Sequence, residues 1–383
     1  MLDGAGCGEL PDAASYGDEG SDTLGHVAAR VPLRVPNLRS LGLSRLLGSG
    51  PGAHAPVVGA WGRMAERSTG KDSVTGHWEM MGVVLAKPFP IFPGGFPSEV
   101  LAEFERRIGR GSLGNVVASG TEIIDRLGAQ HLQTGKPIVY TSADSVFQIA
   151  AHEAVIPVPE LYRFCEAAFD VVVRGLGVGR VIARPFVGEP GAFQRTSNRH
   201  DFAMTPTSET LFDRLTARGV PVVAIGKVGD LFAGRGIARS RPTTRDDEGM
   251  DDVLEEMRTA ATGLIVANLV DFDTVYGHRN DSEGYAANLE RFDERLASVR
   301  RALRDDDLLV ITADHGNDPT TPSTDHSREY VPLFVTGAAV RRDVDLGVRT
   351  TFADLGQTCA EVFGVGTLDH GTSFLEQIRV DPS

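Results

Sequence analysis

The chain has 383 residues, 41% of them hydrophobic and 23% charged, a composition typical of a globular protein with two or three domains. Its net charge of −14 argues against general binding to nucleic acid or to anionic membranes. No apolar run approaches the roughly 18 residues that span a bilayer. The acidic, glycine-rich opening is unlike a signal peptide, and three scattered cysteines indicate a reducing compartment, so we expect a cytoplasmic protein.

Two stretches of the N-terminal part are candidates for a functional site. Asp3–Gly8 looks like a loop leaving the end of a β-strand, although only Met1 and Leu2 precede it. Because an interior strand would support Asp3, we expect this strand to begin upstream of Met1 in the natural protein. Further on, Lys71–Met81 places small hydroxyl residues and a glycine before a helical pattern, which predicts a helix N-terminus suited to an anion or a nucleophile.

The clearest break in composition lies at 88–97, where four prolines and two glycines predict a stiff linker. We therefore predict a core formed by 1–91 and 206–383, with a second domain inserted at 92–205. The insert is expected to be α+β, with helices at 98–108, 121–127 and 160–168 and strands at 115–119, 137–141 and 180–184.

After the insert, apolar strands alternate with helices. A helix should open at Thr205–Thr207, followed by strands at 222–225, 264–270, 308–311 and 331–335 and by helices at 284–304 and 352–363. This alternation predicts a parallel α/β sheet with helices on both faces. Functional loops of such a sheet lie at the C-terminal ends of its strands.

Three aspartates and three histidines follow these predicted strands. They could supply two divalent metal ions with three ligands each and leave positions open for a substrate. Asp271 remains a rival to Asp273, because alternation along a strand would put both on one face. The six candidates are Asp3, Asp273, His278, Asp314, His315 and His326.

Thr75 is the candidate nucleophile between these groups. A hydroxyl next to a metal loses its proton easily, which activates an otherwise weak nucleophile. Phosphoryl transfer also needs charge neutralisation at the attacking and leaving oxygens, which a pair of metal ions supplies. Taken alone, however, Thr75 would most often be a helix cap.

Several motifs together resemble the bacterial phosphopentomutases of the alkaline-phosphatase superfamily. The resemblance runs along nearly the whole chain, through segments 11–26, 70–79, 140–150, 183–186, 195–203, 226–230 and 313–320. It implies a doubly wound, mostly parallel alkaline-phosphatase-like α/β core with an inserted α+β cap. It also implies that the natural chain carries an apolar strand before Asp3.

The resemblance implies a role for each candidate residue. Asp273, His278 and His326 would bind one metal ion, and Asp3, Asp314 and His315 the other, together with the phosphoryl group on Thr75. Manganese is the metal expected from the family, and the oxygen and nitrogen ligands are compatible with it. The positions matching the family's substrate contacts are Ser142, Asp144, Arg184, Arg199, His200 and Lys227.

The activity implied by the resemblance is the interconversion of ribose 1-phosphate and ribose 5-phosphate, or of their 2-deoxy forms, in nucleoside catabolism. Phosphothreonine and a sugar 1,5-bisphosphate would be the intermediates, with a sugar bisphosphate as activator and the cap excluding water. Sugar phosphates are then the expected partners, with no protein partner evident. The alternatives are a metal-dependent phosphatase or phosphodiesterase of the same superfamily and an inactive sugar-phosphate-binding relative.

Overall fold

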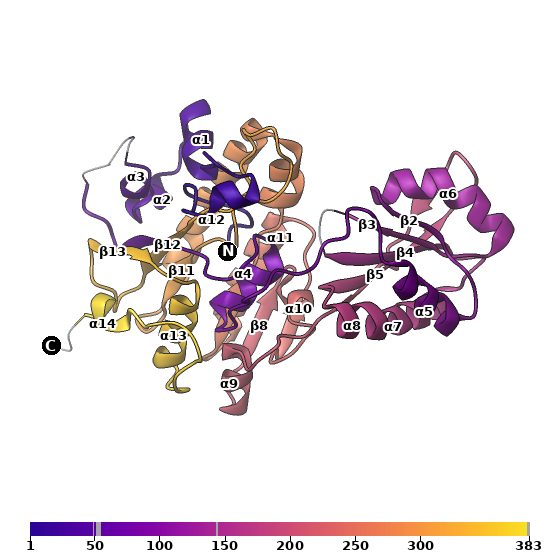
Figure 1. Ribbon diagram of the computed structural model, residues 1–383. Coiled ribbons are helices and arrows are strands. Elements are labelled where there is room, and N and C mark those ends of the chain that lie inside the picture. The colour runs from indigo at the N-terminus through magenta and orange to yellow at the C-terminus, as the bar shows by residue number, and fades with distance from the viewer. Residues whose placement is uncertain (49, 51–54, 143–144, 381–383) are drawn as a thin grey trace. The chain divides into compact units, whose positions relative to one another are not determined.

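The computed structural model describes residues 1–48, 50, 55–142 and 145–380. Its contacts divide the chain into two compact units (Figure 1). We call Met1–Lys87 with Pro206–Ser383 the core unit, and Pro88–Thr205 the inserted unit. The proline-rich stretch predicted as a linker opens the inserted unit, and the role of this unit as a cap stays a prediction.

The strands of the core unit form two sheets. In the first, the order is β11-β12-β1-β13, and in the second it is β10-β8-β9. All pairs in the second sheet are parallel, whereas β12 runs antiparallel to both β11 and β1. The strands are β1 (Ala60–Met64), β8 (Val222–Ile225), β9 (Arg239–Arg241), β10 (Leu264–Ala267), β11 (Leu309–Ile311), β12 (Val331–Thr336) and β13 (Val344–Arg349).

Helices of the core unit surround these sheets (Figure 1). No helix among the described residues is both long and apolar enough to cross a membrane. They are α1 (Thr23–Arg30), α2 (Pro36–Ser40), α3 (Leu43–Leu46), α4 (Ser73–Met80), α9 (Leu211–Ala217), α10 (Val228–Leu231), α11 (Asp246–Thr259), α12 (Ser282–Ala302), α13 (Ala353–Val362) and α14 (Leu375–Ile378), with short turns η1 (Ala13–Tyr16), η3 (Phe272–Tyr276) and η4 (Gly277–Arg279).

The first residues of the chain lie between the two sheets. Leu2 forms a parallel bridge with Leu269, just beyond β10, and its amide donates to the carbonyl of Thr312, just beyond β11. The amide of Asp3 donates to the carbonyl of Leu269 at 3.2 Å. Asp3 is therefore held by backbone hydrogen bonds at the point where the ends of β10 and β11 meet.

Several sequence predictions need correction. Strand β12 is antiparallel to its neighbours, so the first sheet is mixed. Strand β10 ends at Ala267 rather than at residue 270, and strand β11 begins at Leu309 rather than at residue 308. Helix α9 begins at Leu211 and not after Thr205–Thr207, because Thr210 and Asp213 form a capping box there.

The inserted unit is built on one sheet with helices on both faces (Figure 1). Its strand order is β2-β3-β4-β5-β6, with β7 also paired to β5. Helix α6 lies over one face, and α5, α7 and α8 lie over the other. The elements are α5 (Ser98–Ile108), β2 (Leu113–Val117), α6 (Gly120–Thr134), β3 (Ile138–Thr141), β4 (Val146–His152), α7 (Val158–Ala168), η2 (Phe169–Val173), α8 (Arg174–Leu176), β5 (Arg180–Val187), β6 (Gln194–Arg195) and β7 (His200–Ala203).

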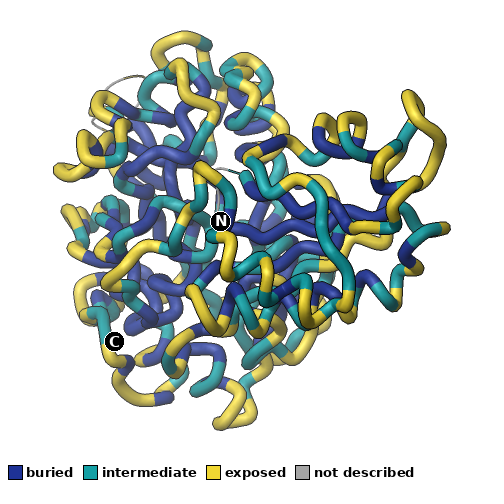
Figure 2. Tube along the Cα trace, turned by 45° about the vertical axis from the view of Figure 1, so that its right-hand side comes forward, coloured by how far each residue is buried: buried dark blue, intermediate teal, exposed yellow. Residues whose placement is uncertain are grey.

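Figure 2 shows the buried segments in dark blue beneath exposed segments in yellow. In the inserted unit, Phe104, Phe147 and Val181 belong to the apolar cluster on one face of the sheet, and Ile123 and Phe186 belong to the cluster on the other. Burying both faces requires an apolar residue at nearly every position of the central strands. The ends of these strands are therefore where polar residues can gather.

Candidate functional site

Asp3, Asp314 and His315 form one group of metal-compatible side chains in the core unit. Asp314 and His315 follow β11, and the backbone bonds described above bring Asp3 beside them. The ring nitrogen Nε2 of His315 lies 3.5 Å from Oδ1 of Asp3 and 3.4 Å from Oδ2 of Asp314. All three residues are almost completely buried.

Asp273, His278 and His326 form the second group. Asp273 lies in η3 and His278 in η4, both after β10, while His326 comes from the loop before β12. Nε2 of His278 is 3.1 Å from Oδ2 of Asp273, and Nε2 of His326 is 3.5 Å from Oδ1 of the same carboxylate. One carboxylate therefore lies between two imidazoles.

The two groups are neighbours, because the rings of His315 and His326 lie against each other with centroids 3.9 Å apart. Both residues belong to the stretch from Asp314 to His326, which follows β11. That stretch contributes Asp314 and His315 to one group and His326 to the other. The six residues predicted as metal ligands are thus brought together in two adjacent sets of three.

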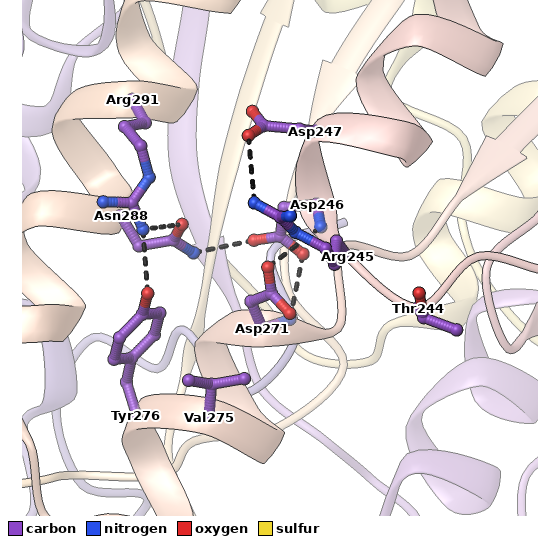
Figure 3. Close-up of a pocket in the computed structure, with 9 residues that line it drawn as sticks. All are labelled: Thr244, Arg245, Asp246, Asp247, Asp271, Val275, Tyr276, Asn288 and Arg291. Atoms are coloured by element: carbon purple, nitrogen blue, oxygen red, sulfur yellow. Dashed lines mark hydrogen bonds and ion pairs between the residues drawn. The ribbon is translucent and has the colours of Figure 1, made fainter.

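The rival ligand Asp271 faces a different part of the core unit. Its Oδ2 accepts from the amide of Asp246, and its own amide donates to Oδ1 of Asp246. Both residues line a pocket of about 450 Å³ that also includes Asn288 and Arg291 (Figure 3). Asp271 and Asp273 therefore point to different surroundings, and Asp273 belongs to the histidine group.

The charge of the first group fits a bound cation. Oδ1 of Asp3 is buried and accepts no hydrogen bond from the described residues. Burial and the nearby carboxylate of Asp314 raise the pKa of Asp3 well above its ordinary value, since two buried negative charges repel each other. Burial also lowers the pKa of His315 to about 4, which keeps the imidazole neutral, as a metal ligand must be. These oxygen and nitrogen donors suit divalent metal ions.

Thr75 is buried in the first turn of α4. The N-cap of this helix is Asp72, whose carboxylate accepts from the amides of Val74 and Thr75 at 3.0 and 3.1 Å. The hydroxyl of Thr75 also donates to Asp72. Asp72 therefore holds both the helix start and the candidate nucleophile, a role that the sequence analysis missed although an Asp before a helical pattern is a common cap.

Ser73 and Lys227 connect α4 to the first metal-compatible group. Oγ of Ser73 is 3.0 Å from Nε2 of His315. Nζ of Lys227 lies 2.6 Å from Oγ of Ser73 and 2.6 Å from Oδ2 of Asp3. Although burial opposes it, the carboxylates of Asp3 and Asp314 raise the pKa of Lys227, so this lysine is cationic.

Close packing sets α4 directly against Asp314. A Cβ atom added to Gly76 would overlap the carbonyl oxygen of Asp314, so only glycine fits there. Nδ1 of His77, a residue whose role the sequence left undecided, lies 3.2 Å from Oδ2 of Asp314. The helix that carries Thr75 therefore touches the backbone and the side chain of one candidate ligand.

Asn317 is a second residue that the sequence analysis missed. It is fully buried, and its Nδ2 donates to Oδ1 of Asp273 at 2.7 Å and lies 3.3 Å from Nδ1 of His278. Its side chain packs against Gly4 and Gly277, where added Cβ atoms would approach within 3.0 and 2.7 Å. The sequence could have indicated Asn317 through its position between Asp314 and Asp318, in the segment that supplies candidate ligands.

The inserted unit holds most of the candidate substrate contacts, whereas Lys227 is in the core unit. Arg184 is half-buried and donates from Nε to Oε1 of Gln148 at 3.1 Å. Arg199 makes two 2.8 Å bonds to Asp201, and the exposed His200 ring packs on Phe202. Ser142 follows β3, and Asp144 lies outside the described residues.

Comparison with known proteins identifies the family. Residues 1–367 match the Metalloenzyme superfamily. The chain is 54% identical to a phosphopentomutase of Caldanaerobacter subterraneus subsp. tengcongensis, over 99% of this chain and 96% of that protein. It is 52% identical to a phosphopentomutase of Carboxydothermus hydrogenoformans, over 99% and 98% of the two chains.

Solved structures support the fold assignment. The phosphoglycerate mutase of Leishmania mexicana is similar over 100% of this chain and 97% of its own, with a TM-score of 0.50 and 14% sequence identity. At this identity the similarity concerns the fold, which is that of the alkaline-phosphatase-like metalloenzymes. The chain belongs to the phosphopentomutases, a family of isomerases within the Metalloenzyme superfamily.

Proposed function

We propose that the chain interconverts ribose 1-phosphate and ribose 5-phosphate, and their 2-deoxy forms, through a phosphorylated Thr75 and a sugar 1,5-bisphosphate. The observation that carries this proposal is the buried Thr75 at the start of α4, a helix that abuts Asp314 in one of two adjacent metal-compatible groups. The family supports it, since the relatives named above are phosphopentomutases. A sugar bisphosphate would prime the dephosphorylated enzyme.

Two divalent metal ions, with Mn²⁺ as the proposed metal, complete this site. Asp3, Asp314 and His315 would hold one ion, and Asp273, His278 and His326 the other. When bound, such ions neutralise the charge that develops on the attacking and leaving oxygens of a transferring phosphoryl group.

Residues around Thr75 would orient it and hold the phosphoryl group. The carboxylate of Asp72 accepts the hydrogen bond of the Thr75 hydroxyl and so fixes the direction of its oxygen. The ammonium of Lys227, 2.6 Å from Oγ of Ser73, brings positive charge to the first turn of α4, where a phosphoryl group on Thr75 would need it. The phosphoryl group would then pass from Thr75 to the free hydroxyl of the sugar, and Thr75 would recover a phosphoryl group from the other end of the bisphosphate.

The inserted unit would bind the rest of the substrate and exclude water, acting as a cap at about 92–205. Arg184 and Arg199 suit the non-reacting phosphate, because a guanidinium can donate two parallel hydrogen bonds to it. Ser142 and Asp144 would contact the ribose hydroxyls, with His200 and Lys227 as further contacts. Excluding water matters because hydrolysis of phospho-Thr75 would end the cycle.

We also propose a cytoplasmic location. Cys7, Cys165 and Cys359 are free thiols. Free and scattered cysteines favour a reducing compartment.

Replacement of the nucleophile tests the covalent route. Thr75→Ala should abolish mutase turnover and remove the phosphoryl adduct from the intact protein mass, while metal content stays near that of the wild type. Thr69→Ala is the matched control, because Thr69 lies in the loop just before α4 and its hydroxyl donates, among the described residues, to the carbonyl of Leu85. Substantial turnover by Thr75→Ala would rule out phospho-Thr75 as the intermediate.

A further inference from the structure

The N-terminus of α6 in the inserted unit is surrounded by hydrogen-bond donors. This helix has 15 residues, and the side chain of its N-cap, Ser119, accepts only from the amide of Glu122 in the first turn. The earlier amides of Gly120 and Thr121 have no partner within the helix. Gly120 is partly exposed and Thr121 is exposed, so a ligand can reach this end of α6.

Tyr140 aims a buried hydroxyl at the same place. Its side chain is fully buried in β3, and the hydroxyl has no hydrogen-bond partner among the described residues. A Cβ atom added to Gly120 would lie 2.9 Å from this hydroxyl and 3.5 Å from Nη1 of Arg195. The hydroxyl and the guanidinium therefore converge on the first residue of α6. A buried hydroxyl without a partner is costly unless a ligand supplies one.

Positive charge is in excess around this hydroxyl. Arg184, Arg195 and Arg199 all lie close enough to act electrostatically on Tyr140. Asp201 pairs with Arg199 and lies 3.6 Å from Arg180, so it is already engaged by two arginines. Arg195 is exposed and forms no ion pair with any described residue. The chain as a whole carries a net charge of −14, which makes this local cationic cluster a departure from the average surface.

We propose that Tyr140, Arg195 and the first amides of α6 form an anion site that joins Arg184 and Arg199 in holding the dianionic, non-reacting phosphate of the phosphorylated pentose. In this site the exposed guanidinium of Arg195 would pair with the phosphate. The hydroxyl of Tyr140 would donate a hydrogen bond to a phosphate oxygen, and so would the amides of Gly120 and Thr121 at the start of α6. This inference rests on the proposed function for the identity of the ligand, and it adds two residues that select a doubly charged phosphate over a neutral group.

The site can be tested without turnover. Inorganic phosphate is titrated calorimetrically into the metal-free full-length chain, and phosphate bound near Thr75 contributes equally in every variant. Arg195→Gln should weaken the binding at the inserted unit at least tenfold, which corresponds to about 1.4 kcal/mol. Tyr140→Phe keeps the buried ring and should weaken it roughly three- to tenfold, the range for a lost hydrogen bond to a charged group.

Arg126→Gln is the matched control. Arg126 lies in α6, its replacement removes the same charge as Arg195→Gln, and its guanidinium lies 3.8 Å from the carboxylate of Glu122. Its phosphate affinity should equal that of the wild type. Equal affinity of Arg195→Gln and the wild type would overturn the site, as would an equal loss in Arg126→Gln. Phosphate binding by the wild type that is insensitive to both Tyr140→Phe and Arg195→Gln would overturn it too.

A second measurement assigns the ligand. If the site holds the substrate phosphate, Arg195→Gln and Tyr140→Phe raise KM for ribose 5-phosphate, with a smaller change in kcat, whereas the control Arg126→Gln leaves KM at the wild-type value. Weaker phosphate binding with an unchanged KM would overturn the assignment to the substrate. A wild-type protein without mutase turnover would refute the proposed function instead, and the phosphate titration would still report on the site.

Discussion

Asn317 provides a quantitative test of the group formed by Asp273, His278 and His326. Its amide donates to Oδ1 of Asp273 at 2.7 Å and lies 3.3 Å from Nδ1 of His278. Asn317→Ala removes this donor and one of the contacts that orient the Asp273 carboxylate, while the three candidate ligands stay in the chain. The loss of such an outer partner typically lowers metal affinity about 10- to 100-fold, or about 1.4–2.7 kcal/mol.

The assay is a calorimetric titration of the metal-free protein with Mn²⁺, fitted to two sites. Asn317→Ala should weaken one site by this factor and leave the site of Asp3 and Asp314 nearly unchanged. Asn288→Ala is the matched control, since Asn288 is also buried and donates to a carboxylate, Asp246, that belongs to neither group. Thermal unfolding of both metal-free variants separates lost stability from lost affinity.

Two results would refute this reasoning. The first is wild-type affinity at both sites in Asn317→Ala, which would mean that Asp273 needs no outer partner. The second is an equal loss in Asn288→Ala, which would show that the effect comes from general loosening of the core unit.

Three further outcomes are expected. Arg328→Met should lower the free energy of unfolding by about 3–5 kcal/mol, because Glu66, 2.7 Å from Arg328, would be left buried and unpaired. Urea unfolding measures this loss of stability, and a loss below about 1 kcal/mol would contradict the prediction. Burial raises the pKa of Glu329 from 4.5 to about 7, so its protonated form contributes stability below pH 4.5 that is lost as the pH rises through 7, about 3 kcal/mol in all. Unfolding measured at both ends of this range should show a smaller pH dependence in Glu329→Gln than in the wild type, and an equal dependence refutes the assignment. Gly76→Ala should lower kcat/KM at least tenfold with the fold retained, because the added methyl overlaps Asp314 and displaces α4; steady-state kinetics and circular dichroism decide, and unchanged kinetics would contradict it.

The metal-compatible groups could be predicted from sequence because their polar residues directly follow the apolar strands β10 and β11, whose ends meet beside Asp3. The choice between Asp271 and Asp273 could not be made from the residues, because alternation assumes that the strand continues. Here β10 ends at Ala267 and the chain turns into η3, so the two side chains face different surroundings. Strand ends are the least predictable part of an element, and in this chain they carry the candidate ligands.

Other features depended on contacts that no local pattern encodes. An apolar run such as β12 is compatible with either strand direction, so its antiparallel pairing could not be foreseen. The hydrogen bond from Asn317 to Asp273 joins residues 44 positions apart. The convergence of Tyr140 and Arg195 on Gly120 likewise needs the sheet of the inserted unit to be assembled first.

The central claim is tested most directly by phosphorus NMR of the wild-type protein with ribose 1-phosphate, Mn²⁺ and a sugar bisphosphate. The proposed mutase converts the ribose 1-phosphate signal into that of ribose 5-phosphate, with no growth of the inorganic phosphate signal. Release of inorganic phosphate without ribose 5-phosphate would contradict the proposal and indicate a hydrolase. An unchanged spectrum under the same conditions would contradict any catalytic role with this substrate.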